Sequence, residues 1–143
     1  ETALWSRINP NDEKSMNDFH QIKFDGKLLQ VEKFNRIHKT CMGFIRKSVE
    51  KSTASHIMVV THHLPTFEVV APQYKNSILN SAFASEYGDW IVHSRIDAWS
   101  YGHSHSNIDT EIGGTRLICN QMGYVFANEH LVNGFEPKKH LEI

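Results

Sequence analysis

The chain has 143 residues, the size of one domain, and 40% of them are hydrophobic, which is enough for a folded core. The formal net charge is −1 and no run of basic residues occurs, so the sequence predicts no nucleic-acid-binding patch. It also predicts no membrane contact, because no apolar run approaches the roughly 20 residues of a membrane span. Two widely separated cysteines without a CxxC pair favour reduced thiols in a cytoplasmic protein. The ten histidines are the unusual feature of the composition.

The first third of the chain predicts one short strand and one long helix. Residues 2–8 read as a strand that ends at a turn cluster. Residues 16–22 are ambiguous between a loop and a short helix, and Asp25-Gly26 is typical of a turn. In residues 28–49 apolar side chains recur at spacings of three and four, which predicts a helix with one buried face.

The remainder predicts strands separated by short helices. A continuous apolar run at residues 57–60 indicates a central strand buried on both faces. Residues 97–101 predict the next strand, and Gly113-Gly114 predicts a hairpin with a primed turn. Two short helices are expected at residues 76–87 and 88–94, and a last strand at residues 140–143. Together these elements predict the α/β class, a mixed sheet with flanking helices.

Two of the predicted strands end in histidines. The first runs into His62 and His63, and the second runs into a Gly-His-Ser-His motif that contains His103 and His105. Ligands of open α/β sheets bind at the C-terminal ends of strands, and neutral imidazole is a common metal ligand. Alternate residues of an extended chain point to the same side, so His103 and His105 are expected to face one ion. We therefore predict His62, His103 and His105 as metal ligands, with His63 contacting substrate as a catalytic residue or simply packing.

Three imidazoles suffice for one zinc ion with an open position but not for a two-metal site. Two divalent ions about 4 Å apart repel each other and need anionic ligands, typically a bridging carboxylate. Asp97 precedes its strand and Asp109 begins the hairpin, so neither is placed to bridge two ions. The residues thus supply about half of a two-metal site.

Segments 59–65 (VVTHHLP) and 101–105 (YGHSH) resemble the last two signature blocks of the calcineurin-like metallophosphoesterases. Residues 2–6, 16–19, 79–83, 115–120 and 123–124 are also similar to bacterial members. The resemblance implies an αββα sandwich with two divalent metal ions, Mn, Fe or Zn, between its sheets. It implies that His62 and His103 bind one ion and His105 the other. A metal-held water then attacks a phosphomonoester or phosphodiester substrate.

The three earlier blocks of that family, DxH, GDxxD and GNH, do not occur in this sequence. The resemblance therefore implies that residues 1–143 are a single partial domain, the C-terminal half of such an enzyme with the N-terminal half absent. We expect little phosphatase activity from the chain alone. Because half a sandwich exposes an edge and a face, we also expect association with the missing half or with a second copy.

A second hypothesis is a non-catalytic module that holds one structural or regulatory zinc ion through His62, His103 and His105. A metallo-β-lactamase-type hydrolase is disfavoured, because Ser106-Asn107 follows the motif where an Asp-His pair is required.

Three further residues are candidate phosphate contacts because they follow or flank the second histidine strand. These are Asn107, Arg116 and Asn120. Arginine suits bidentate recognition of phosphate. An ordinary surface role for each remains open.

Overall fold

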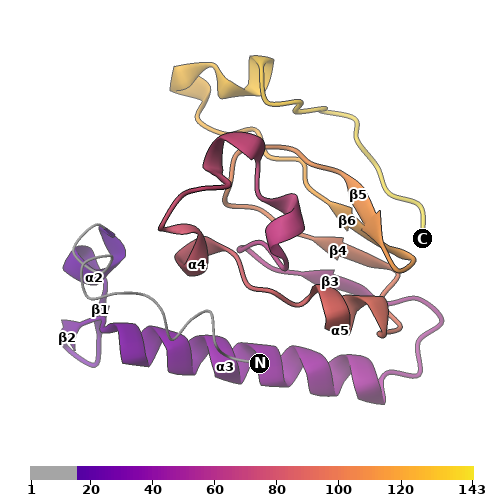
Figure 1. Cartoon of the computed structure of the whole chain (residues 1–143), viewed down its shortest axis with the longest axis horizontal. Coiled ribbons are helices and arrows are strands. Elements are labelled where there is room, and N and C mark those ends of the chain that lie inside the picture. The colour runs from indigo at the N-terminus through magenta and orange to yellow at the C-terminus, as the bar shows by residue number, and fades with distance from the viewer. Residues whose placement is uncertain (1–15) are drawn as a thin grey trace. The chain divides into compact units, whose positions relative to one another are not determined.

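A computed structural model describes residues 16–143, and the strand predicted at residues 2–8 lies outside the described part. The chain divides into two compact units, residues 1–51 and 52–143 (Figure 1). Within the described residues, no helix combines the length and apolar character needed to cross a membrane.

Unit 1, residues 1–51, contains a short hairpin and a long helix. Its described elements are α2 (Asp18–Gln21), β1 (Lys23–Phe24), β2 (Lys27–Leu28) and α3 (Val31–Lys51). Asp25 and Gly26 form the hairpin turn with φ of +50° and +77°, as a type I′ turn requires. The predicted turn is confirmed, and residues 16–22 adopt the helical alternative around Phe19. Phe19 is buried, and its ring meets that of Phe34 edge to face at 5.9 Å.

The predicted long helix is confirmed as α3, although it begins at Val31 because Leu28 pairs in the hairpin. Met42 and Val49 are its buried residues, and their spacing of seven places them on one stripe. Cys41 on this helix is exposed and forms no disulfide.

Unit 2, residues 52–143, is built on a four-stranded mixed sheet with helices. Its strands are β3 (Met58–Val60), β4 (Ala98–Ser100), β5 (Thr110–Ile112) and β6 (Thr115–Ile118). They lie in the order β3-β4-β6-β5, as Figure 1 shows. β3, β4 and β6 run parallel, and β5 pairs antiparallel with β6. This mixture of parallel strands and helices confirms the α/β class.

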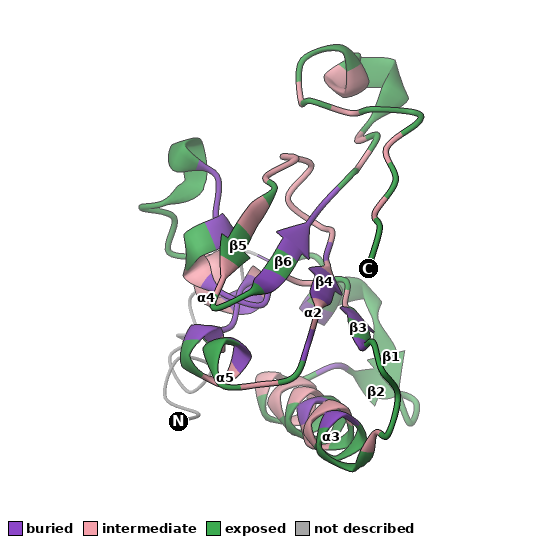
Figure 2. Cartoon of the chain, turned by 90° about the vertical axis from the view of Figure 1, so that its right-hand side faces the viewer, coloured by how far each residue is buried: buried purple, intermediate pink, exposed green. Residues whose placement is uncertain are grey.

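The prediction that the first of these strands is buried on both faces is wrong. β3 is an edge strand of the described sheet (Figure 2). It buries Val59, while Met58 and Val60 are 45% and 70% exposed. Alternate side chains of a strand point to opposite faces, so only one face of β3 is covered. A short apolar run does not distinguish one covered face from two.

The core of unit 2 lies on β4 and β6. Trp99 of β4 and Leu117 of β6 are almost fully buried and are register partners. Trp90 of α5 meets the Trp99 ring edge to face at 5.9 Å. This packing fixes the strand from which the second histidine motif emerges.

The predicted glycine hairpin is confirmed. Gly113 and Gly114 connect β5 to β6 with φ of +58° and +89°, which favours glycine at both positions. A Cβ added to Gly113 would lie 2.7 Å from the Cα of Val92, so this position also has no space for a side chain.

The two predicted short helices are confirmed but shorter, as α4 (Asn80–Phe83) and α5 (Gly88–Val92). Four 3₁₀ turns accompany them: η2 (Phe67–Val69), η3 (Pro72–Tyr74), η4 (Val125–Ala127) and η5 (Glu129–Leu131). The strand predicted at residues 140–143 does not form. A run of four residues carries too weak a pattern, and none of its residues pairs with the described strands.

Candidate metal centre

The candidate site lies where β3 and β4 end side by side. Val60 and Ser100 are register partners, and both strands run in the same direction. The ladder continues beyond them, because Thr61 N donates to Ser100 O at 3.0 Å and Gly102 N donates to His62 O at 2.9 Å. The parallel pairing therefore brings residues 61–63 and 101–103 together, although about 40 positions separate them in sequence.

Three imidazoles converge at this end. His62, His63 and His103 each place a ring nitrogen so that all three nitrogens lie within 4.8 Å of one another. Nδ1 of His103 lies 3.2 Å from Nε2 of His62. His62 is exposed and the other two are half-buried, so the group is open to solvent. These atoms form a ready set of nitrogen ligands.

An aromatic side chain flanks the group on one side. Phe83, the last residue of α4, stacks on the His103 ring at 4.2 Å with an interplanar angle of 24°. It also meets His63 edge to face at 6.0 Å. Stacking restricts the ring of His103 and excludes water from one of its faces.

The backbone of His63 is anchored to the core. The Thr61 hydroxyl donates to His63 O at 2.8 Å, and Trp99 Nε1 donates to the Thr61 hydroxyl at 2.9 Å. Trp99 is buried, so the hydroxyl satisfies a donor that water does not reach. The position of His63 thus depends on a side chain in the middle of the sheet.

The second predicted ligand of the motif lies outside the group. His105 Nδ1 instead lies 2.8 Å from Oε2 of Glu129. Residues 103–105 bend, and His103 and His105 have φ of +74° and +50°. The prediction assumed an extended chain, and these two left-handed residues remove the alternation on which it depended. Non-glycine residues in this region are uncommon and concentrate at functional sites.

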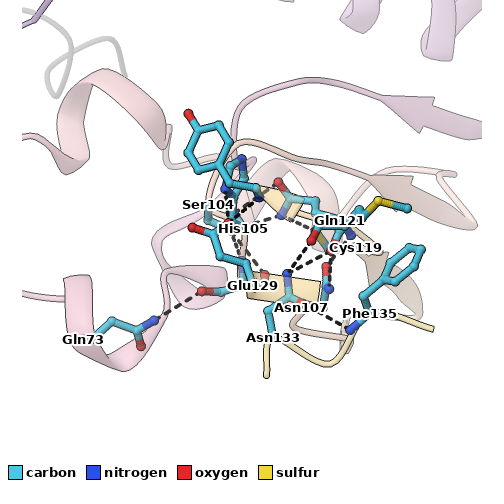
Figure 3. Close-up of polar contacts among 12 residues, drawn as sticks. Gln73, Ser104, His105, Asn107, Cys119, Gln121, Glu129, Asn133 and Phe135 are labelled. Carbon is cyan, nitrogen blue, oxygen red and sulfur yellow. Dashed lines mark hydrogen bonds and ion pairs between the residues drawn. The ribbon is translucent and has the colours of Figure 1, made fainter. Parts of the chain in front are cut away.

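A network of amides holds the loop that carries His105 (Figure 3). The backbone N–H of His105 donates to Gln121 Oε1 at 3.2 Å. Asn107 donates to Gln121 O at 2.9 Å and accepts from Gln121 N at 2.6 Å. Asn133 Nδ2 donates to the same carbonyl at 3.0 Å. Asn107, predicted to contact substrate, therefore uses both amide atoms to join two loops, and it also lines the groove beside them.

The other two predicted substrate contacts are engaged elsewhere. Arg116 forms a bidentate pair with Asp109, with Nε–Oδ1 and Nη2–Oδ2 distances of 3.2 and 2.9 Å. It pairs in register with Ala98, at the start of β4 and away from the histidines. Asn120 exchanges two hydrogen bonds with the backbone of Glu136. Both side chains are therefore engaged with other parts of the chain, and their role in binding phosphate stays a prediction.

Asp97 and Asp109, which the sequence did not place as bridging ligands, are both engaged in other contacts. Asp97 Oδ2 accepts from Ile57 N at 2.6 Å, at the end of the strands opposite to the imidazoles. That hydrogen bond is the main cause of the lowered pKa of Asp97. The pKa of Asp109 is lowered chiefly by hydrogen bonding from Arg116. Among the described residues, the ligand group contains no Asp or Glu.

Glu129, Gln121 and Phe83 are site residues that sequence reasoning missed. They lie 16 to 24 positions from the side chains they contact, and none belongs to a recognisable spacing. Glu129 lies six positions after Gly123, and the stretch between them carried no specific signal. Only the folded arrangement reveals their role.

No protein-family model matches this sequence, and neither the curated proteins nor the solved structures contain a significant match. The fold and the site themselves define an α/β protein with a group of three imidazoles that could hold a metal ion.

Proposed function

We propose that this chain carries the histidine ligands of a metal-dependent phosphoesterase and forms the C-terminal half of its αββα domain. The observation that carries the proposal is the convergence of His62, His63 and His103. Its place supports the proposal, because the C-terminal ends of parallel strands are where α/β sheets bind ligands. The segments that bring the rings together are the two that resemble calcineurin-like metallophosphoesterases.

The donor set fits a divalent metal ion. Zinc–nitrogen bonds of about 2.05 Å in a tetrahedron place neighbouring nitrogens about 3.3 Å apart. The 3.2 Å between His103 Nδ1 and His62 Nε2 agrees with this spacing. Imidazole suits zinc or iron better than manganese, whose preferred ligands are oxygens. A bound ion would act as a Lewis acid toward the phosphate ester and activate the attacking water.

We propose a role for each of the four rings. His62 and His103 are proposed as ligands of one ion, and His105 as a ligand of the second. His63 reaches the same group as His62 and His103, so it serves either as a third ligand or as the residue that meets the substrate. The two roles predict different losses. Removing a third ligand weakens metal binding, whereas removing a substrate contact weakens only the binding of phosphate.

The complete site requires carboxylates that the described histidine group does not contain. We propose that a complementary segment supplies them, and that the chain alone hydrolyses phosphate esters slowly or not at all. The exposed Met58 and Val60 of the edge strand β3 are consistent with a surface that such a segment covers.

Metal binding is tested by titrating the metal-free chain with Zn²⁺ in a calorimeter. His62→Ala and His103→Ala are expected to weaken binding at least tenfold. His140→Ala is the matched control, because His140 is exposed and, among the described residues, contacts only its near neighbours Lys138 and Glu142. Equal affinity for all of these variants would contradict the proposed site.

The phosphoesterase role is tested with inorganic phosphate and Co²⁺, a paramagnetic substitute for zinc. We expect the ³¹P signal to broaden only when the chain is loaded with Co²⁺, and His62→Ala to abolish the broadening. A chromogenic phosphodiester is expected to show negligible turnover by the chain alone. Turnover comparable to ordinary enzymes would refute the incomplete site.

A module that holds a single zinc ion is the second candidate. It is favoured by the same three-imidazole group, whose neutral donors match a one-metal site without any carboxylate. This candidate predicts one ion per chain, no phosphate binding by the loaded protein, and no effect of His105→Ala on metal affinity. The phosphoesterase proposal predicts the opposite for the last two observations.

A further inference from the structure

Glu129 and His105 form a pair that the sequence motif did not reveal. The 2.8 Å contact joins Glu129 Oε2 to Nδ1 of His105. Carboxylates only accept hydrogen bonds when ionised, so Nδ1 must carry the proton. Nε2 is then the nitrogen with the free lone pair. In the described part of the chain, Nε2 of His105 makes no hydrogen bond.

Glu129 is itself held firmly in place. Tyr124 N donates to Glu129 Oε2 at 2.7 Å, and this hydrogen bond is the main cause of the lowered pKa of the carboxyl. The carboxylate lies against Gly123, where an added Cβ would overlap Oε2. Gly123 has φ of +70°, so the backbone and the space both favour glycine there. The chain thus leaves room for this carboxylate beside His105.

His105 is fixed from two further directions. Its backbone N–H donates to Gln121 Oε1, and the Tyr124 ring meets its ring edge to face at 4.6 Å. His105 and Glu129 line a groove of about 370 Å³ together with Gln73 and Asn107. The residues that orient this imidazole all come from positions 121–129, after β6. A surface histidine does not need three such restraints.

We infer that Glu129 is a positioning residue that fixes the Nδ1–H tautomer of His105 and so leaves Nε2 free to act as a metal ligand. This inference rests on the proposed function, in which His105 binds the second ion. Metal-ligating histidines typically donate their other ring N–H to a carboxylate, which sets the tautomer and raises ligand basicity. Loss of such a partner typically weakens metal binding about 10–100-fold.

The tautomer is the first readout and needs no metal. Two-bond ¹H–¹⁵N spectra of histidine-labelled chain report which ring nitrogen carries the proton. We expect the Nδ1–H form at His105 in the wild type and a loss of that form in Glu129→Ala. Glu129→Gln keeps an acceptor oxygen and is expected to restore the Nδ1–H form in part. Glu136→Ala, which removes an exposed carboxylate from the same segment, is expected to leave the tautomer unchanged.

Zn²⁺ titration of the same samples is the second readout. We expect the His105 Nε2 resonance to shift on metal addition, and Glu129→Ala to weaken that response about 10–100-fold while His62 and His103 respond as in wild type. The β6 amide spectrum checks that each variant is folded.

Two results would overturn the inference: an unchanged tautomer in Glu129→Ala, or an unchanged metal response at His105 in that variant. Failure of the proposed function gives a different pattern, because the His62 and His103 resonances then do not respond to metal while the metal-free tautomer result still stands.

Discussion

The hydroxyl of Thr61 offers a direct test of how the core of unit 2 supports the imidazole group. It accepts from the indole N–H of Trp99 and donates to the carbonyl of His63. Thr61→Val keeps the shape of the side chain and removes both hydrogen bonds. Trp99 is only 1% exposed, so its N–H is left without a partner and without water.

The expected cost follows from these two contacts. Leaving a buried donor unsatisfied costs about 1–3 kcal/mol. The carbonyl of His63 is half-buried and can bind water instead, so its loss adds about 0.5 kcal/mol. We therefore expect Thr61→Val to lower the free energy of unfolding of unit 2 by about 2 kcal/mol. Thr61→Ser keeps both hydrogen bonds and is expected to lose less than about 1 kcal/mol, the value of one methyl group.

A double-mutant cycle with Trp99→Phe isolates the hydrogen bond from the loss of indole volume. Once the donor is gone, removing the acceptor is nearly neutral, so we expect a coupling energy of about 1–2 kcal/mol. Urea unfolding is followed by near-ultraviolet circular dichroism, to which the Trp90–Trp99 pair contributes. Zn²⁺ affinity is measured on the same variants, and Thr61→Val is expected to bind several-fold more weakly than Thr61→Ser. Additive effects, or a Thr61→Val stability within 0.5 kcal/mol of wild type, would refute the reasoning.

Three further predictions concern Gly43, the Gly113-Gly114 turn and the carboxyl group of Asp97. Gly43→Ala is expected to raise the thermal stability of α3 by about 1 kcal/mol, because an added Cβ meets only open space; a loss of helical circular dichroism at lower temperature would contradict this. Gly113→Ala is expected to destabilise the hairpin more than Gly114→Ala in urea unfolding, because only the Gly113 Cβ collides with Val92, and equal losses would be inconsistent with that contact. The lowered pKa of Asp97 stabilises the fold above the ordinary carboxyl pKa of about 4, and this contribution is lost as pH falls through the lowered value. Asp97→Asn is therefore expected to flatten the acid limb of a stability-against-pH curve, and an unchanged acid limb would exclude the effect.

The sequence predicted the elements whose signals are local. The long helix follows from its period of three to four, and the β5–β6 hairpin follows from Gly113-Gly114, whose positive φ values only glycine adopts easily. The same is true of the turn at Asp25-Gly26. Each of these predictions uses information contained within about 20 neighbouring residues.

Exposure and the exact ligand set depend on contacts between distant segments. The apolar pattern of residues 57–60 is the same whether one face of the strand or both faces are covered. Only the strand order shows that β3 lies at an edge of the described sheet. Glu129 contacts His105 from 24 positions away. No periodicity in the sequence marks such a pair, so it was not predicted.

The placement of the four histidines shows why spacing alone does not define a metal site. A His-x-His pair shares one side only while the backbone is extended, and here φ becomes positive at both His103 and His105. The bend directs His103 toward His62 and His63, and it directs His105 toward Glu129. Neighbouring His62 and His63, by contrast, reach the same group because the strand has already ended. The two histidines of the motif therefore contact two different groups, the imidazoles of His62 and His63 and the carboxylate of Glu129.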